Sequence, residues 1–204
     1  MSPKSPAMRL LFTALACLIS VSVFGQSWEQ TLGGESGHSV QQTNDGGYIV
    51  AGTTQLSGTR YVYLIKTDEN GNEQWSKTFG GYMSHDEGMS VKQTLDGGYI
   101  VTGYTSDFGT QDRDVYLIKT DGNGNEQWSQ TFGGTGYDVG TSVQQTTDEG
   151  YIITGSLNGD NESSDVYLIK TDENGNELWS QTFGGESGEG GSSVQQTSDG
   201  GYII

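Results

Sequence analysis

The chain has 204 residues, 33 of them glycine, and its 26 acidic against 9 basic residues give a formal net charge of −17. This balance disfavours binding to nucleic acids or to anionic lipid surfaces, because both rely on Lys and Arg to neutralise phosphates. Cys17 is the only cysteine, so no disulfide within the chain can stabilise its fold.

Residues 1–25 are predicted to be a signal peptide. The basic residues Lys4 and Arg9 precede an apolar run over residues 10–24. The small or medium-sized residues before Gln26 fit a signal-peptidase site. The run is short for a membrane span, which needs about 20 apolar residues. We therefore expect a chain that is secreted or displayed at the cell surface, with no membrane span in its mature form. Cys17 also allows a lipoprotein leader, but apolar residues continue beyond it.

Residues 26–34 predict a lone strand, namely the fourth strand of a repeat that lacks its first three. Trp28 in this strand matches Trp75, Trp128 and Trp179, each of which closes a segment that begins Tyr-Leu-Ile-Lys-Thr-Asp. Because the Trp recurs at the same place, we expect these four to be structural residues packed between repeats. The alternative is an exposed aromatic platform for sugars.

A repeat of about 51 residues occupies the rest of the chain. Tyr48, Tyr99, Tyr151 and Tyr202 stand in the same Gly-Tyr-Ile element, 51, 52 and 51 residues apart. Such a period indicates units that bury their apolar surface only against their neighbours.

One repeat predicts four β-strands. Asp-Gly and Asp-x-x-Gly sequences predict the turns after the first and third strands, and a polar loop follows the second. The third strand has an unbroken apolar run, so we expect both of its faces to be covered. In the second repeat the predicted strands are 90–94, 99–105, 114–120 and 126–132.

Four antiparallel strands per unit is the size of one propeller blade. We therefore predict an all-β fold, a β-propeller built of four-stranded antiparallel blades, with a β-solenoid as the alternative. The sequence stops at Ile204, two strands into a repeat, which predicts a fragment truncated at its C-terminus. The predicted region spans 26–204, with full blades at 35–81, 82–134 and 135–185 and a partial blade at 186–204.

Residues 133–140 (Gly-Gly-Thr-Gly-Tyr-Asp-Val-Gly) and 148–155 (Asp-Glu-Gly-Tyr-Ile-Ile-Thr-Gly) resemble the β-propeller repeats of large bacterial exported surface proteins. Residues 172–179, Asp-Glu-Asn-Gly-Asn-Glu-Leu-Trp, are similar to a hairpin of quinoprotein-type propellers. The resemblance covers the chain after the leader and implies further blades, adhesive modules and a sorting domain. It implies no particular activity. The first junction lacks the Asp, and the last has Glu189 at the Asp138 position.

In a propeller, the loops after the second and fourth strands emerge on one face. Their sequences vary between repeats while the hairpins at the opposite end barely change, which is typical of a ligand-facing surface but also of tolerant loops. The residues expected there are Asp107, Glu162 and the main candidates His85, Asp86, Asp138, Glu189, Asp112, Arg113, Asp160 and Asn161.

No catalytic constellation is apparent in the sequence: His38 and His85 stand in loops of different repeats without a nucleophile motif. Calcium at the Asp68–Asn72 turn is possible, although the glycine comes too early for a helix–loop–helix site, and the turn interpretation is favoured. We expect no other cofactor. The sequence therefore predicts a non-catalytic scaffold that binds an extracellular protein, a polysaccharide or calcium. Part of a propeller enzyme, either quinoprotein-like or glycan-active, and a plain structural spacer are the alternatives.

Overall fold

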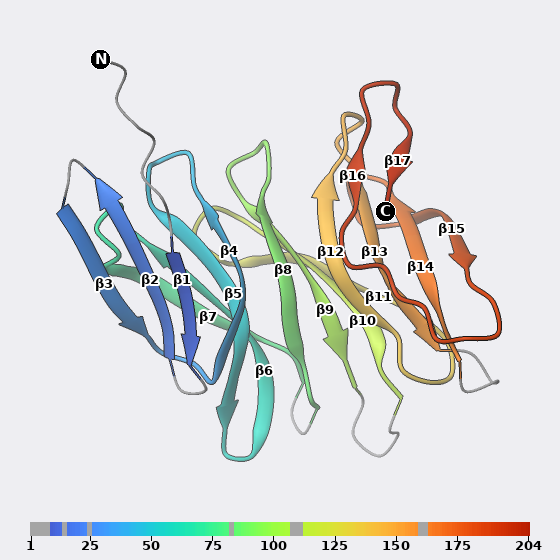
Figure 1. Cartoon of the computed structure of the whole chain (residues 1–204), viewed down its shortest axis with the longest axis horizontal. Helices are drawn as coiled ribbons and strands as arrows, with labels where there is room; N and C mark the ends of the chain where they lie inside the picture. The colour runs from blue at the N-terminus through green and yellow to red at the C-terminus, as the bar shows by residue number, and fades with distance from the viewer. Residues whose placement is uncertain (1–8, 14–15, 24–25, 82–83, 107–111, 159–162) are drawn as a thin grey trace.

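The computed structural model describes residues 9–13, 16–23, 26–81, 84–106, 112–158 and 163–204. These residues form strands and turns with no helix; accordingly, none of them belongs to a helix that could cross a membrane. Three successive units each contain one four-stranded antiparallel sheet, in which the strands pair in chain order and none of the sheets closes on itself. In Figure 1 the sheets follow one another along the long axis of the molecule.

The three units have matching strands. Unit 1 consists of β4 (Ser36–Gln42), β5 (Tyr48–Leu56), β6 (Thr59–Thr67) and β7 (Glu73–Phe79). Unit 2 consists of β8 (Glu87–Gln93), β9 (Tyr99–Thr105), β10 (Asp114–Thr120) and β11 (Glu126–Phe132). Unit 3 consists of β12 (Val139–Gln145), β13 (Tyr151–Asn158), β14 (Ser164–Thr171) and β15 (Glu177–Phe183). The short strands β16 (Gln195–Gln196) and β17 (Tyr202–Ile203) pair as the start of a further unit.

The N-terminal segment differs from the expected lone strand. β3 (Gln26–Leu32) is the third strand of a sheet with β1 (Arg9–Thr13) and β2 (Ala16–Val23), both of which lie inside the predicted leader. While residues 1–25 remain part of the chain, β2 supplies backbone hydrogen-bond partners for β3. Removal of residues 1–25 on export would leave β3 without those partners. Trp28 pairs with Val21 in this sheet, and its side chain lies outside the described residues.

The hydrophobic core lies between successive sheets. One cluster joins Ile49, Leu64 and Phe79 of unit 1 to Tyr99 and Ile118 of unit 2. Equivalent clusters join unit 2 to unit 3 and unit 3 to Val194 and Tyr202. Both faces of the central strands are therefore covered, which explains why the third strand of each repeat is apolar without alternation.

Trp75 and Trp128 lie in these interfaces. Trp75 of unit 1 makes an edge contact with Tyr99 of unit 2, with ring centroids 5.8 Å apart, and Trp128 makes the same contact with Tyr151 at 5.7 Å. A Cβ on Gly124, in the β10–β11 turn, would lie 2.6 Å from the Trp75 ring. This turn therefore requires glycine both for close approach and for its positive φ of 74°.

The first strands of neighbouring units are joined by side chains and not by a backbone ladder. The amide oxygen of Gln41 accepts a hydrogen bond from the Gln93 backbone N–H at 2.7 Å, and Gln144 does the same for Gln196 at 2.9 Å. Each sheet thus remains a separate unit that stacks on the next. This arrangement differs from a filament in which strands of successive units pair continuously.

Candidate functional site

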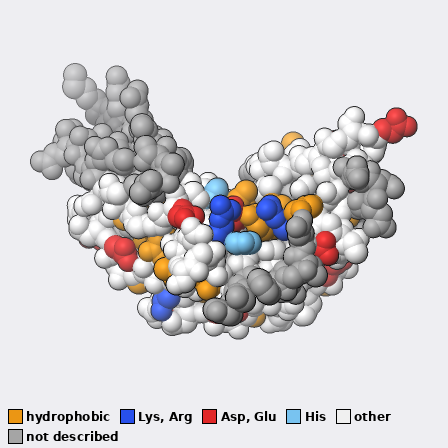
Figure 2. All heavy atoms as spheres, turned by 90° about the horizontal axis from the view of Figure 1, so that it is seen from below, with side chains coloured by type: hydrophobic (Ala, Val, Ile, Leu, Met, Phe, Trp, Pro, Cys, Tyr) orange, Lys and Arg blue, Asp and Glu red, His pale blue; other side chains and the backbone are white. Residues whose placement is uncertain are grey.

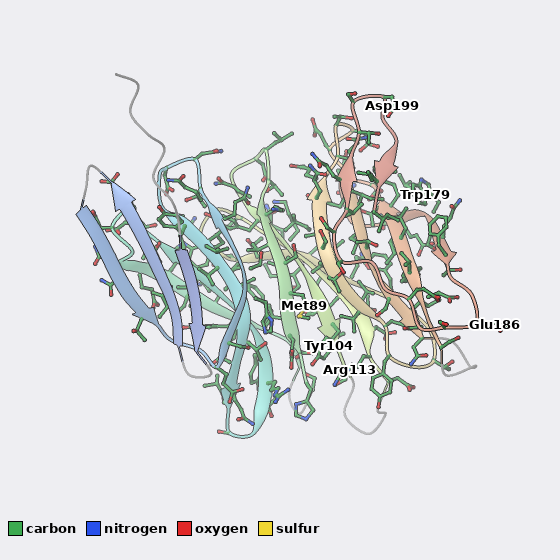
Figure 3. The ribbon with its side chains drawn as sticks, viewed as in Figure 1. Met89, Tyr104, Arg113, Trp179, Glu186 and Asp199 are labelled. Atoms are coloured by element: carbon green, nitrogen blue, oxygen red, sulfur yellow. The ribbon has the colours of Figure 1, made fainter. Side chains whose placement is uncertain are left out.

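The two ends of the units differ in chemistry. The loops after the second and fourth strands lie at one end, which we call the loop face, and the turns after the first and third strands lie at the other, which we call the hairpin end. Figure 3 shows Arg113 and Glu186 at the loop face and Asp199 at the opposite end. Isolated parallel bridges join the two kinds of loop at the loop face, pairing Arg60 with His85 and Arg113 with Tyr137.

A buried lysine marks the hairpin end of every complete unit. Lys119 is almost fully buried, and its ammonium donates to Asp96 at 2.7 Å, to the Thr120 carbonyl at 2.9 Å and to Gln127 at 3.0 Å. Burial of Asp96 acts to raise its pKa, but the hydrogen bonds from Lys119 and Thr94 outweigh that effect, and the pKa is about 2. This set of contacts, which we call the Lys–Asp clamp, satisfies every proton of the buried ammonium.

The clamp repeats in unit 1, and unit 3 keeps its aspartate and carbonyl contacts, with Leu178 in place of the glutamine. Lys66 pairs with Asp45 at 2.8 Å and Lys170 with Asp148 at 3.0 Å. The Lys66 hydrogen bond is the largest cause that lowers the pKa of Asp45 to about 2. The glycine two residues after the aspartate is required by close approach, since a Cβ on Gly47 would lie 2.1 Å from the Thr67 carbonyl oxygen. The clamp is thus a structural device.

Two of the predicted ligand residues, Asp86 and Asp138, are 0 % exposed. The Asp138 carboxylate accepts from the backbone N–H groups of Gly134 and Asn158, both at 2.8 Å. The Asp86 carboxylate accepts from the Gly81 N–H at 3.2 Å and from the hydroxyls of Ser84 and Thr105. Burial raises the pKa of both aspartates. These carboxylates hold the junction loop to the end of the second strand, so their geometry differs from that of a ligand-facing group.

The other predicted residues are placed as follows. Glu189 is half-buried and accepts weakly from the Gly185 N–H at 3.3 Å. His85 and Asp112 are exposed, and Arg113 is half-buried. Asp160 and Asn161, like Asp107 and Glu162, lie outside the described residues.

A pocket of about 500 Å³ opens at the loop face. Figure 2 views this face and shows Lys or Arg and His side chains gathered in a central hollow beside hydrophobic ones. Its lining combines two arginines and a histidine with two tyrosines and two neutral polar residues, drawn from three successive repeats: Gln55, Arg60, His85, Tyr104, Ser106, Arg113 and Tyr137.

Arg113 is held between two aromatic rings. Its guanidinium carbon lies 4.3 Å from the centroid of the Tyr104 ring and 5.3 Å from that of Tyr137. Tyr104 is 4 % exposed, whereas Tyr137 is 44 % exposed. Stacking of this kind stabilises a guanidinium while leaving the N–H groups at its edge directed outward.

Arg60 is held differently. Its guanidinium donates to the Glu87 carboxylate at 2.8 Å, with the Arg60 side chain 46 % exposed and that of Glu87 16 % exposed. Burial raises the pKa of Tyr104 to about 12, and a hydrogen bond with Glu87 acts in the same direction, so the phenol is neutral at physiological pH. Glu87 thus contacts both Arg60 and Tyr104, and it neutralises the charge of Arg60.

The arginine position of the pocket differs between the units. The backbone oxygens of Arg60, Arg113 and Ser164 accept from the equivalent N–H groups of Asp86, Asp138 and Glu189. Unit 3 therefore has serine where units 1 and 2 have arginine.

Two other features of the described residues bear on function, the arrangement of possible metal ligands and a Ser–His pair. They contain no group of three or more His, Cys, Asp or Glu side chains arranged to hold a metal ion. At the calcium candidate, the Asp68 carboxylate accepts from the N–H groups of Asn70 and Asn72 within its own turn. Ser36 and His38 are hydrogen-bonded at 2.8 Å, but this pair is exposed, and the described residues supply no third group that orients the imidazole.

The pocket lining includes Arg113 and His85, which the sequence placed among the candidates, and Arg60, Tyr104 and Tyr137, which it did not. The Lys–Asp clamp was also not predicted. The clamp could have been recognised from the sequence. A lysine directly precedes Thr-Asp in every complete repeat, and an aspartate stands two residues before the glycine of every Gly-Tyr-Ile element. The pocket had almost no such signal, because its arginine position is kept in only two of the three units and its other residues do not repeat.

Comparison with known proteins shows the fold alone. The chain matches no family model and no curated protein. It is similar in structure to a protein of unknown function from Dyadobacter fermentans DSM 18053, with a TM-score of 0.55 and 14% identity over 91% of this chain and 59% of that one. The chain thus spans less than two thirds of that protein, and an identity this low carries an architecture without an activity.

Proposed function

We propose that this chain is an exported, non-catalytic scaffold of the β-propeller type, which binds an extracellular ligand through its loop face. The observation that carries the proposal is the basic and aromatic pocket built around Arg113 at that face. Pockets of about 300–1,000 Å³ with a few convergent polar groups are the usual form of a small-ligand site. The ligand is an extracellular polysaccharide or protein.

The propeller is supported by the way the units stack. Four-stranded meanders follow one another, their first strands lie side by side, and the core fills the space between sheets. In a propeller, blades of this kind surround a central axis. Bacterial export is supported by the apolar run over residues 10–24. Expression with the native N-terminus in a bacterial host, followed by N-terminal sequencing of the exported protein, is expected to show Gln26 as its first residue.

Binding is tested by capture of the purified protein on a panel of immobilised extracellular polysaccharides and surface proteins. We expect capture by at least one member, loss of capture when Arg60 and Arg113 are both changed to Gln, and an unchanged ligand mass after incubation. The matched control changes Lys77 and Lys92 to Gln, which removes the same charge away from the pocket. Capture lost in the control and retained in the loop-face variant, or turnover of the ligand, would contradict the proposal.

A further inference from the structure

The loop-face pocket is a local concentration of positive charge on an acidic protein. Arg60, His85 and Arg113 line it, whereas the whole chain carries −17. Such a protein repels polyanions at long range. An anion that enters the pocket must therefore carry few charges and must gain its affinity from contacts inside it.

Arg113 supplies the most available donors. The rings of Tyr104 and Tyr137 lie against its guanidinium, and no other described residue takes a hydrogen bond or ion pair from it. A guanidinium fixed in orientation, with edge N–H groups that no described residue uses, matches a planar carboxylate, which accepts two parallel hydrogen bonds.

Arg60 adds little net charge, because Glu87 pairs with it at 2.8 Å. The pocket therefore offers about one uncompensated guanidinium together with an exposed imidazole. This balance favours a ligand with a single negative group at the site over a phosphate or a dense run of charges.

The rest of the lining suits a hydroxyl-rich ring. The exposed part of Tyr137 presents an apolar surface with a polar tip, and Gln55 adds an exposed amide. Ser106 is fixed by hydrogen bonds to the backbone of His85, donated and accepted at 3.3 and 3.1 Å. A ring carrying hydroxyls can use the Tyr137 hydroxyl and the Gln55 amide, whereas the acidic side chain of a peptide needs only the arginine.

From these observations we propose that the pocket binds one acidic sugar unit, with a carboxylate at the Arg113 edge and its ring against Tyr137. This inference rests on the proposed function and names its ligand class, an extracellular saccharide with isolated carboxylates.

The test is isothermal titration of the purified chain with a glucuronate-containing disaccharide. Three comparison ligands are its methyl ester, a disaccharide with a sulfate in place of the carboxylate, and a short Glu-containing peptide. We expect binding of the uronate that weakens as salt is raised, with the methyl ester at least tenfold weaker because it cannot form the ion pair. Equal affinity for ester and acid, or binding of the peptide but not the saccharide, would overturn the proposal. Preference for the sulfate would overturn the assignment of a carboxylate.

Variants place the ligand. Arg113→Gln is expected to weaken uronate binding about tenfold, and Arg113→Lys to weaken it less, because the charge remains while the fork is lost. Lys92→Gln, in the same unit at the hairpin end, is the control and should have no effect. Each variant is checked by thermal unfolding. If Arg113→Gln does not fold, Tyr137→Ala tests the same pocket, and unchanged binding in that variant would overturn the proposal.

The outcome separates this inference from the broader one. Uronate that fails to bind, while the loop face still captures a neutral polysaccharide or a protein, ends the acidic-sugar assignment alone. A different result would also end the proposed function of the loop face. In that result the chain binds uronate, Lys92→Gln abolishes the binding and Arg113→Gln leaves it intact.

Discussion

The two ends of the units use positive charge in opposite ways. At the hairpin end, Lys66, Lys119 and Lys170 are buried, each paired with an aspartate and present in every complete unit. At the loop face, Arg60 and Arg113 are more accessible, occur in two units and are replaced by Ser164 in the third. A buried charge that recurs at the same position in every unit stabilises the fold. A charge that breaks the repeat at a pocket is the better candidate for function.

The largest expected effect is at a clamp lysine. Lys119→Ala removes a buried side chain and leaves the Thr120 carbonyl without its donor, so we expect a loss of about 3 kcal/mol in the free energy of unfolding. Urea denaturation of this variant beside Arg113→Ala measures the contrast. A loss at Arg113 as large as at Lys119 would break the distinction between the two ends.

The clamp aspartate gives the next effect. Asp96→Asn leaves the Lys119 ammonium buried without its counter-charge, which should cost about 2 kcal/mol. Asp199 is a matched control, because it makes the same contacts with Thr197 and Gly201 and pairs with no lysine among the described residues. Asp199→Asn should therefore cost clearly less in the same urea titration.

The pH dependence follows from the same pairs. The pKa values of Asp45 and Asp96 are about 2 in the fold, against 3.8 as the ordinary value. Their stabilisation is complete above pH 4 and is lost as the pH falls from about 4 towards 2. The raised pKa values of Asp86 and Asp138 act in the opposite direction. Thermal unfolding as a function of pH should show a flatter acid limb in an Asp45→Asn, Asp96→Asn double variant.

The smallest effect on stability is expected at the loop face. Arg113→Gln should change the free energy of unfolding by less than about 1 kcal/mol, because only its contacts with the Tyr104 and Tyr137 rings are lost, at a half-buried position. Differential scanning calorimetry checks this expectation. A larger loss would assign Arg113 to the fold and weaken its candidacy as a ligand group.

Local patterns predicted most of the architecture. The Asp-Gly and Asp-x-x-Gly turns, the four strands of each repeat and the covered third strand follow from backbone preferences and from the order of apolar residues, which act over a few positions. The packing of Trp75 and Trp128 between sheets followed from their recurrence. The loop residues were harder, because burial decides what an aspartate does. Asp86 and Asp138 are sealed inside the junctions, whereas the sequence gives them the same appearance as solvent-facing acids.

The amino-acid sequence by itself determined the repeat, its strands and its turns, since each depends on interactions between residues close together in the chain. Only the tertiary structure decided that Arg60, Tyr104 and Tyr137 share one pocket with Arg113. These residues belong to three repeats and come together through the stacking of whole sheets, and a contact of that kind leaves no periodic trace in the sequence.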